Sequence, residues 1–370
     1  MSSVNQSSVN QNELEGAIKN YSDPYLDKNL YELQAVKSLS CEEGKVELSI
    51  EMPYVCDGIM GGMKQILMSN LEFVEGVESV DVQVSTKVGV HQAQNNLKTL
   101  PGIKNIIAVA SGKGGVGKST TSVNLALALA KEGASVGLLD ADIYGPSLGM
   151  MLGIPEGTRP ETVDDKFFVP IEKHGVQVIS MAFLVTDKTP MVWRGPKVSG
   201  ALLQLLTQSK WDNLDYLIID LPPGTGDIQL TMAQKIPVSG SIVVTTPQDI
   251  ALLDCKKGIE MFRKVDIPVF GVVENMSVHI CSECGHHESL FGEGGGERIA
   301  KEFDTEVLGE MPLHKTIREQ TDAGTPTVVA APDSEIALLY QDIARKVAAK
   351  LSQEAIDERH AYPNIVVSSD

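Results

Sequence analysis

The chain has few basic residues for its number of acidic ones. Its 370 residues include 31 Lys and Arg against 49 Asp and Glu, which gives a formal net charge of −18. Such a charge repels phosphate backbones and anionic lipid, so we expect neither nucleic acid nor membrane among its partners. The sequence also lacks any run of the roughly 18 apolar residues that a membrane-spanning helix needs.

No targeting signal is recognisable at the start of the sequence. The stretch MSSVNQSSVNQN is polar and has neither a basic start nor an apolar segment, unlike a signal or transit peptide. We therefore expect a disordered lead-in over residues 1–12 and a cytoplasmic protein. Five cysteines, an odd number, then indicate reduced thiols, and a close pair favours a metal or redox site over a structural disulfide.

Hydrophobic patterning predicts a small α+β domain over residues 13–88. KVELSIEM (45–52) and ESVDVQVST (78–86) alternate polar and apolar residues, as half-buried strands do. The segment between them has apolar residues at helical spacing. Residues 89–103 are polar and contain glycine and proline, which is typical of a linker.

A second pattern begins at residue 104, where short apolar runs alternate with helical stretches. The runs start at residues 106, 135, 176, 216, 241 and 269. Continuous apolar strands between helices are typical of a parallel sheet covered on both faces. The sequence therefore predicts an α/β fold with a mostly parallel sheet over residues 104–352, followed by a tail at 353–370.

The motif GKGGVGKS fits the phosphate-loop pattern G-x-x-x-x-G-K-[ST] and lies between an apolar strand and a predicted helix. We expect its backbone N–H groups to cradle phosphates, Lys118 to neutralise the β and γ phosphates of ATP, and Ser119 to bind Mg²⁺. The predicted nucleotide-binding residues are Gly112, Lys113, Gly114, Gly115, Val116, Gly117, Lys118, Ser119 and Thr120.

Acidic residues follow two of the predicted strands. Asp220 ends LDYLIID, where the aspartate that holds Mg²⁺ through water is found in P-loop ATPases, and PPGTGD after it is typical of a switch loop. Asp140 and Asp142 end another strand, so they could reach the metal and the attacking water. We predict Mg²⁺ at Ser119, Asp140 and Asp220, and catalysis by Lys118 and Asp142. Capping of a helix remains the alternative for Asp142.

The phosphate loop contains an additional lysine, Lys113. KGGVGKST followed by DAD resembles the deviant-Walker ATPases, a group that includes MinD, ParA and the nitrogenase iron protein. In that group the early lysine touches the phosphates bound to the other subunit of a face-to-face dimer. The resemblance implies a homodimer in which Lys113 is catalytic, as an arginine finger is. A solvated loop lysine remains the alternative.

Cys281 and Cys284 form the C-x-x-C of the chain. Two thiolates can hold a soft metal, yet they leave a zinc ion or a [4Fe–4S] cluster two ligands short. In a two-fold dimer the partner's copy of the pair would supply the rest. A zinc ion bridged by the same four thiolates, a redox disulfide, and a zinc site using His286 or His287 remain open. Cys41 and Cys255 are predicted to be packed thiols.

Residues from about 104 to 350 resemble the Mrp/ApbC family of iron–sulfur cluster carrier ATPases. The matching stretches include LLDADIYGPS, VWRGPKVSGAL, TTPQDIALLD, ENMS, CSECG and FGEGGGERIA. The resemblance implies ATP hydrolysis, a homodimer, and a labile [4Fe–4S] cluster passed to apo-proteins, with assembly factors as further partners. It also implies that Asn275 and the segment around Pro312 lie against the adenine. The family often has proline where this chain has Ser282.

Residues 13–87 resemble the small domain of iron–sulfur assembly factors through SDPYL and MPYVCDG. Cys56 falls at the predicted start of a helix, where the dipole and free N–H groups lower a thiol pKa. It could then receive or hand over iron or sulfide, and a plain buried thiol is the alternative.

Three rival functions remain. A positioning ATPase of the MinD or ParA kind would need a basic surface or a basic amphipathic tail, and the tail here is mostly acidic. An ATP-gated electron donor would keep its cluster in a protected site, whereas CSECG is flanked by polar sequence. A zinc-bridged regulatory dimer is separable by metal analysis.

Overall fold

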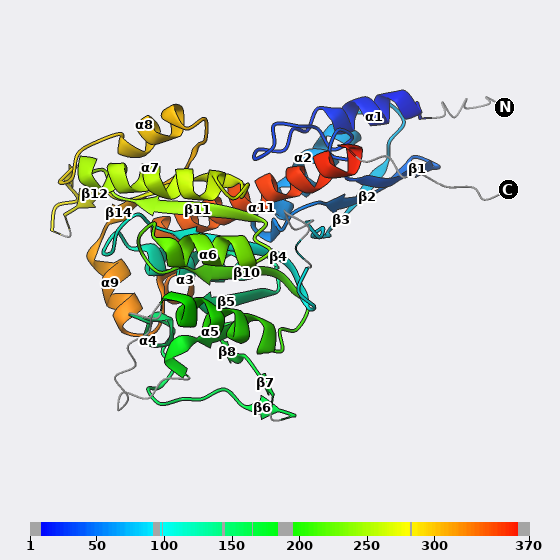
Figure 1. The fold of residues 1–370 in the computed structure, drawn as a ribbon. Coiled ribbons are helices and arrows are strands. Elements are labelled where there is room, and N and C mark those ends of the chain that lie inside the picture. The colour runs from blue at the N-terminus through cyan, green and yellow to red at the C-terminus, as the bar shows by residue number, and fades with distance from the viewer. Residues whose placement is uncertain are drawn as a thin grey trace, which may run out of the picture. The chain divides into compact units, whose positions relative to one another are not determined.

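The fold comes from a computed structural model that describes residues 9–91, 97, 99–142, 145–164, 166–183, 195–281 and 283–361, without side chains at 195–198, 227–228 and 354–361. Contacts divide the chain into two compact units (Figure 1). The first unit comprises Met1–Gly89 with Ala348–Asp370, and the second comprises Val90–Val347.

The first unit contains a three-stranded sheet with β2 in the centre, antiparallel to β1 and parallel to β3. Its elements are α1 Gln11–Lys19, β1 Val36–Glu42, β2 Lys45–Met52, α2 Asp57–Glu72 and β3 Ser79–Thr86. Val46, Leu48, Ile50 and Met52 are buried and alternate with more exposed neighbours. One face of the strand therefore carries the core of this unit, as the sequence pattern predicts.

Two helix ends differ from the sequence expectation. Helix α1 begins at Gln11, inside the predicted lead-in, because the side chain of Asn10 accepts the N–H of Asn12 at 3.0 Å and caps it. Helix α11, Glu335–Ala361, continues past residue 352, where a tail was expected to begin. The residues there, SQEAIDERHA, are mostly good helix formers, and nothing in them stops a helix.

The second unit is built on a sheet of nine strands, counted over the described residues, in the order β13-β12-β11-β4-β10-β5-β9-β8, with β14 also on β12. Its strands are β4 Ile103–Ala110, β5 Val136–Asp140, β8 Ile171–Lys173, β9 Val176–Ser180, β10 Leu214–Asp220, β11 Gly240–Thr245, β12 Val269–Ile280, β13 His287–Glu288 and β14 Val307–Leu313. Among these described strands, β8 pairs antiparallel with β9 and β13 pairs antiparallel with β12, and the other pairings are parallel. The mostly parallel α/β fold class is confirmed.

Helices cover both faces of this sheet. The helices are α3 Lys118–Lys131, α5 Gly195–Gln208, α6 Asp227–Lys235, α7 Asp249–Arg263 and α8 Gly295–Glu302, with the shorter α4 Leu148–Met151, α9 Lys315–Asp322, α10 Thr327–Ala330 and the 3-10 helix η2 Met181–Phe183. Residues of α5, α6, α7 and α8 share one core cluster with one side of the strands, and Figure 1 shows α5, α6 and α7 on the same face. Helix α3 contacts the strands but contributes nothing to that cluster, so it covers the other face.

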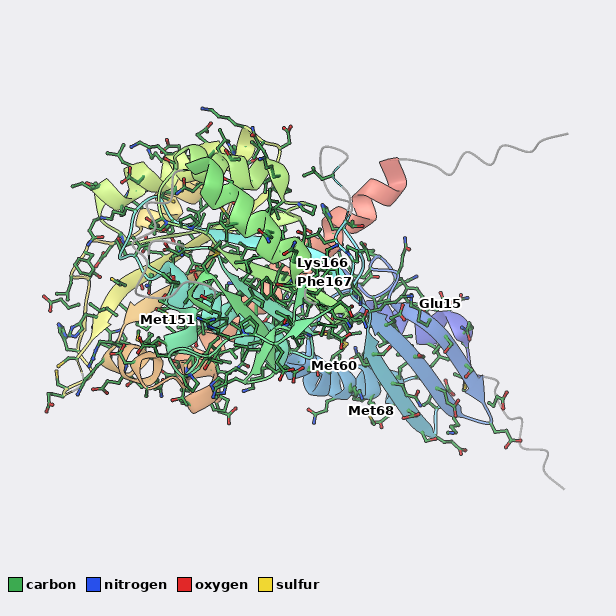
Figure 2. All side chains as sticks on the ribbon, turned by 60° about the horizontal axis from the view of Figure 1, so that its bottom comes forward. Glu15, Met60, Met68, Met151, Lys166 and Phe167 are labelled. Carbon is green, nitrogen blue, oxygen red and sulfur yellow. The ribbon has the colours of Figure 1, made fainter. Side chains whose placement is uncertain are left out.

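A small hairpin lies outside the main sheet. Strands β6, Thr162–Val163, and β7, Phe167–Phe168, pair antiparallel. The ammonium of Lys166 lies 5.3 Å from the ring centroid of Phe167, within cation–π range (Figure 2).

Strand register brings the predicted acidic residues to one edge of the sheet. Asp220 at the end of β10 pairs with Asp140 at the end of β5 and with Val109 near the end of β4. The loops after these three strands therefore leave from the same edge, which is the usual ligand-binding edge of an open α/β sheet. Within the described residues, no helix combines the length and the apolar character needed to cross a membrane.

Candidate nucleotide site and cysteine turn

The turn between β4 and α3 can be formed only with glycine at several positions. Gly115 and Gly117 have φ of +82° and +86°, in the left-handed region. A Cβ on Gly117 would lie 2.0 Å from Nδ2 of Asn275, and a Cβ on Gly112 would lie 2.2 Å from the carbonyl carbon of Asp254 in α7. The turn is thus pressed against β12 on one side and α7 on the other.

The outer part of the turn is open to ligands. Gly114 and Gly115 are exposed, whereas Val116 is buried and anchors the turn. Helix α3 follows directly, and Thr120 lies half-buried in its first turn. Exposed backbone next to the positive end of a helix is a ready anion site.

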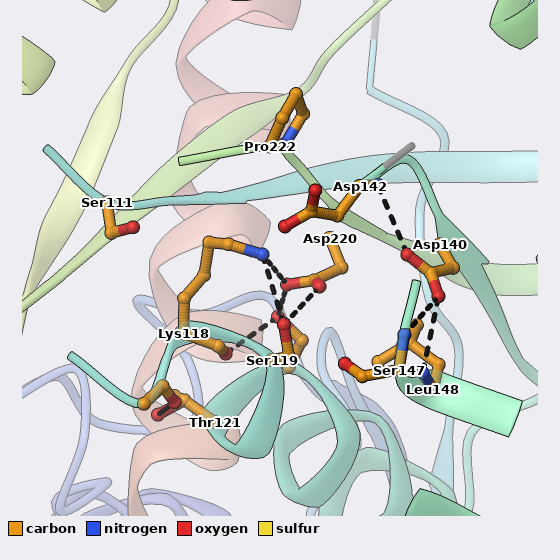
Figure 3. Close-up of polar contacts among 12 residues, drawn as sticks. Ser111, Lys118, Ser119, Thr121, Asp140, Asp142, Ser147, Leu148, Asp220 and Pro222 are labelled. Carbon is orange, nitrogen blue, oxygen red and sulfur yellow. Dashed lines mark hydrogen bonds and ion pairs between the residues drawn. The ribbon is translucent and has the colours of Figure 1, made fainter. Parts of the chain in front are cut away.

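Lys118 lies at the centre of a polar network at the start of α3 (Figure 3). Its Nζ is 2.7 Å from Oδ1 of Asp220 and 3.2 Å from Oγ of Ser119. Ser119 donates its hydroxyl to Oδ2 of Asp220 at 2.6 Å, and Oγ of Ser122 is 2.6 Å from Oδ1. The structure therefore brings together the predicted Lys118, Ser119 and Asp220.

Ser122 is a site residue that the sequence reasoning missed. Its side chain is fully buried and reaches the carboxylate of Asp220 from α3. Residues separated by three or four positions lie on the same face of a helix, so a hydroxyl three residues after Ser119 was the available signal.

The pair formed by Lys118 and Asp220 is buried, with 6% and 0% of the side chains exposed. Each charge therefore depends on the other for compensation. Removing one partner of a buried pair typically costs about 3–5 kcal/mol, because the remaining charge is left in a poorly solvating interior.

Asp140 accepts four hydrogen bonds, and its binding of Mg²⁺ stays a prediction. Its Oδ1 accepts the N–H of Asp142 at 3.1 Å, and its Oδ2 accepts the N–H groups of Ser147 at 3.1 Å and Leu148 at 3.2 Å. The hydroxyl of Ser180 donates to the same Oδ2 at 3.0 Å. Asp140 thus caps the start of α4, the role that was the alternative for Asp142.

The carboxylates of Asp140, the last residue of β5, and Asp142 differ in orientation. Burial, and next the charge of Asp220, raise the pKa of Asp140 to about 7. Among the described residues no hydrogen bond or ion pair joins Asp140 to Ser119, its predicted partner in binding Mg²⁺. Asp142 is half-buried, and Figure 3 shows its carboxylate turned toward Lys118 and away from Asp140.

The switch-like loop after Asp220 packs directly on the phosphate loop. The N–H of Gly224 donates to the carbonyl of Ser111 at 2.9 Å. Nε2 of Gln229 donates to the carbonyl of Pro223 at 2.8 Å, which fixes the loop from α6. A displacement of the switch-like loop will therefore move the phosphate loop, and the reverse.

Lys113 differs from Lys118 in its surroundings. It is half-buried, and its carbonyl accepts the hydroxyl of Ser111 at 2.9 Å. In the part of the chain that the structure describes, no hydrogen bond or ion pair engages its ammonium group.

Asn275 contacts the phosphate loop itself. Its Nδ2 donates to the carbonyl of Val116 at 2.8 Å, and its Oδ1 accepts the N–H of Met276 at 3.0 Å. The placement against adenine that the family resemblance implies stays a prediction, and the contact with the phosphate turn was not foreseen.

Cys281 and Cys284 lie in the tight turn between β12 and β13. The N–H of Cys281 donates to the carbonyl of His286, and the N–H of Gly285 donates to the carbonyl of Cys281, both at 2.9 Å. The thiol of Cys281 is half-buried and that of Cys284 is exposed. Backbone N–H groups of Cys284 and Glu283, and then the Cys284 side chain, lower the pKa of Cys281 through hydrogen bonds.

The described side chains do not complete a metal site around these thiols. Over the described residues there is no group of three or more His, Cys, Asp or Glu side chains that could hold a metal ion. His286 and His287 are both exposed. Cys255 is fully buried, and burial raises its pKa to about 12, whereas Cys41 is half-buried.

Cys56 lies in the first unit, at the N-cap of α2, and is fully buried. Near it, the hydroxyl of Tyr54 donates to Oδ2 of Asp23 at 2.6 Å. Burial, followed by Asp23 and Cys56, raises the pKa of Tyr21 to about 12. The predicted helix start at Cys56 is confirmed, and its role in iron or sulfide transfer stays a prediction.

Both units match known protein families. Residues 102–348, two thirds of the chain, match the ParA family described as NUBPL iron-transfer P-loop NTPase. The chain belongs to this family. Residues 11–84 match the family described as iron-sulfur cluster assembly protein. The resemblance to iron–sulfur carrier ATPases with an N-terminal assembly domain is therefore confirmed.

Individual relatives agree with the family match. An iron-sulfur cluster carrier protein of Pseudomonas fragi is 66% identical over 282 residues, 76% of this chain and 97% of that protein. One from Escherichia coli K12 is 51% identical over 336 residues, 91% of each chain. Among solved structures, a nucleotide-binding protein from Archaeoglobus fulgidus in complex with ADP is 37% identical, with a TM-score of 0.54 over 60% of this chain and 87% of that one. The P-loop NTPase fold is thus confirmed.

Proposed function

We propose that the chain is an ATP-dependent carrier that holds a labile [4Fe–4S] cluster between two subunits and transfers it to apo iron–sulfur proteins. The observation that carries this proposal is that one chain combines a phosphate-loop network with half of a thiolate metal site. The names of the Pseudomonas and Escherichia relatives support the choice of an iron–sulfur cluster as the cargo.

The nucleotide half of the function rests on the network around Lys118. The ammonium would transfer its ion pair from Asp220 to the β and γ phosphates, which frees the carboxylate for Mg²⁺ beside Ser119. Mg²⁺ would neutralise the charge that develops on the phosphates. Asp142 would orient the attacking water, and Asp140 would act through its hydrogen bonds to the loop that carries Asp142.

A homodimer would complete both sites. The ammonium of Lys113 has no partner within the described residues, so it is available to the phosphates of the other subunit. Likewise the two thiolates of each chain find no third ligand among the described residues, and two such pairs give the four sulfurs that a [4Fe–4S] cluster takes. A single two-fold axis would account for both features.

The cysteine turn suits a cargo that has to leave. Cys284 and the residues from Glu283 to His286 are exposed, and backbone hydrogen bonds hold the turn. Hydrogen bonds to Cys281 favour the thiolate, the form that binds iron. Exposure lets an acceptor protein approach the cluster and exchange ligands with it.

Transfer to an acceptor is the test of this function. The cluster-loaded protein would be mixed anaerobically with an apo-dehydratase whose activity returns only when a [4Fe–4S] cluster is inserted. We expect activity to return in the presence of an iron chelator that stops free iron and sulfide from reacting. The variant with Cys281→Ala and Cys284→Ala is the control. Recovery at the same rate with this control, or none with the wild type, would refute the carrier role.

A further inference from the structure

Strand β12 joins the nucleotide site to the cysteine turn. In its middle, Asn275 donates to the carbonyl of Val116 in the phosphate loop. Cys281 follows six positions later, immediately after the end of the strand. At a rise of about 3.3 Å per residue in an extended strand, the backbone between them spans at most roughly 20 Å.

The contact at the nucleotide end leaves no free space. The amide of Asn275 occupies the position where a Cβ of Gly117 would be, at 2.0 Å. Both polar atoms of this amide are used, one by Val116 and one by Met276. The Val116–Gly117 turn cannot move toward β12 without displacing Asn275, and it cannot move away without breaking the hydrogen bond to Val116.

The strand is irregular directly after Asn275. Met276 has φ of +57°, a left-handed conformation that a methionine adopts only when its surroundings hold it there. The pairing of β12 with β14 shifts register between Asn275 and His279. The hydroxyl of Ser277 donates to the carbonyl of Met311 at 3.1 Å and holds the kink on β14. The irregular stretch of β12 thus lies between Asn275 and Cys281.

The chain that follows Cys281 and Cys284 returns to β12 at the start of α8. The carboxylate of Glu274 accepts the N–H of Gly296 in the first turn of α8. A Cβ on Gly295 would lie 2.9 Å from Oε2 of Glu274, so helix and carboxylate are in close contact. The segment that leaves β12 at Cys281 therefore returns, at the start of α8, to Glu274, the residue before Asn275.

We propose that Glu274 and Asn275 are positioning residues that couple nucleotide binding to the arrangement of Cys281 and Cys284. Nucleotide that moves the Val116 carbonyl shifts Asn275 and the kink at Met276, and the cysteine turn follows through β12 and α8. Because coupling is reciprocal, a ligand on the thiols changes nucleotide affinity by the same factor. The proposal rests on the proposed function only for the identity of that ligand.

Thiol reactivity in the cluster-free protein tests this coupling. The reaction of Cys281 and Cys284 with dithionitrobenzoate is timed without nucleotide, with MgADP, and with Mg²⁺ and a non-hydrolysable ATP analogue. The protein carries Cys41→Ser, so that Cys41 does not react with the reagent. Cys56 and Cys255 are buried and need no substitution. Titration with a fluorescent nucleotide gives, for each variant, the nucleotide concentration that saturates the binding site. We expect nucleotide to change the wild-type rate by about 5-fold or more, the lower end of typical coupling between sites.

Asn275→Ala is expected to bind nucleotide at saturation yet show a rate ratio close to one. Asn275→Asp keeps the shape but cannot donate to Val116, so it decides the matter if the alanine variant fails to fold. The matched control is Thr305→Val, which removes a hydrogen bond to the carbonyl of Val269 at the opposite end of β12. The Thr305→Val control should keep the wild-type rate ratio. If the Asn275 variants lost the ratio only because the protein is less stable, the control would lose it as well.

Two results would overturn the proposal. One is a wild-type ratio of one with nucleotide bound, and the other is an undiminished ratio in both Asn275 variants. Neither result concerns the cargo, because no cluster is present in the assay. A protein that transfers a cluster but shows an Asn275-independent ratio would keep the proposed function and lose this coupling path. A protein that shows the coupling but never holds a cluster would keep this coupling path and lose the proposed function.

Discussion

The buried pair of Lys118 and Asp220 allows its structural role to be separated from its role in catalysis. Lys118→Met removes the ammonium and leaves Asp220 buried and negatively charged. Two hydroxyls, those of Ser119 and Ser122, still lie 2.6 Å from that carboxylate and continue to stabilise it. We therefore expect the free energy of unfolding to fall by about 3 kcal/mol, the lower end of the range for a broken buried pair.

Asp220→Asn should cost about as much, since the ammonium of Lys118 is then left buried without its counter-charge. In the double variant neither charge remains, so the loss should be smaller than the sum of the two single losses by about 2–3 kcal/mol. All three variants should be inactive as ATPases, because each lacks the group for phosphate, the group for Mg²⁺, or both. The double variant removes the unpaired buried charge but does not bring these groups back.

Denaturant unfolding followed by tryptophan fluorescence measures these free energies, because both tryptophans, at positions 193 and 211, belong to the second unit. Phosphate release under saturating MgATP measures activity in parallel. Strictly additive losses of stability would show that the two charges do not compensate each other. Wild-type ATPase activity in Lys118→Met would refute the assignment of the nucleotide site.

Three further changes test other parts of the account. Lys113→Ala should still bind a fluorescent nucleotide but lose hydrolysis by about 10³-fold, as arginine-finger removal does elsewhere, and undiminished hydrolysis would exclude its action in trans. Ser122→Ala should raise the Mg²⁺ concentration for half-maximal ATPase about 5-fold through loss of roughly 1 kcal/mol at Asp220, so an unchanged Mg²⁺ titration would count against it. Burial raises the pKa of Glu274 above its usual 4.5, so stability should fall as pH rises from 4.5 through the raised pKa. In Glu274→Gln that part of the pH dependence of unfolding should be absent, and its persistence would show that another group titrates.

Local chemistry allowed much of the nucleotide site to be predicted. The spacing from Gly112 to Ser119 determines a turn followed by a helix, and the position of Asp220 follows from one apolar run ending at a sheet edge. These predictions depend on residues close in sequence or on a general rule of parallel sheets. The same logic predicts that the C-x-x-C turn is half of a metal site, which stays a prediction.

Contacts between distant segments could not be predicted in this way. The bond from Asn275 to Val116 joins residues 159 positions apart, and Asp140 bonds Ser180 across 40 positions. Pattern and propensity give the elements but not which side chain fills a given gap between them. Asp140 and Asp142 show this well, since the sequence places both at one strand end and only packing decides which of them caps α4.

The central claim is that two copies of the cysteine turn hold one [4Fe–4S] cluster. Anaerobic reconstitution with iron and sulfide, followed by metal and sulfide counting and an absorption spectrum, tests it most directly, with the double variant Cys281→Ala, Cys284→Ala as control. The account predicts about four iron and four sulfide per dimer, absent from the control. Zinc without sulfide, or a full cluster in the control, would contradict it.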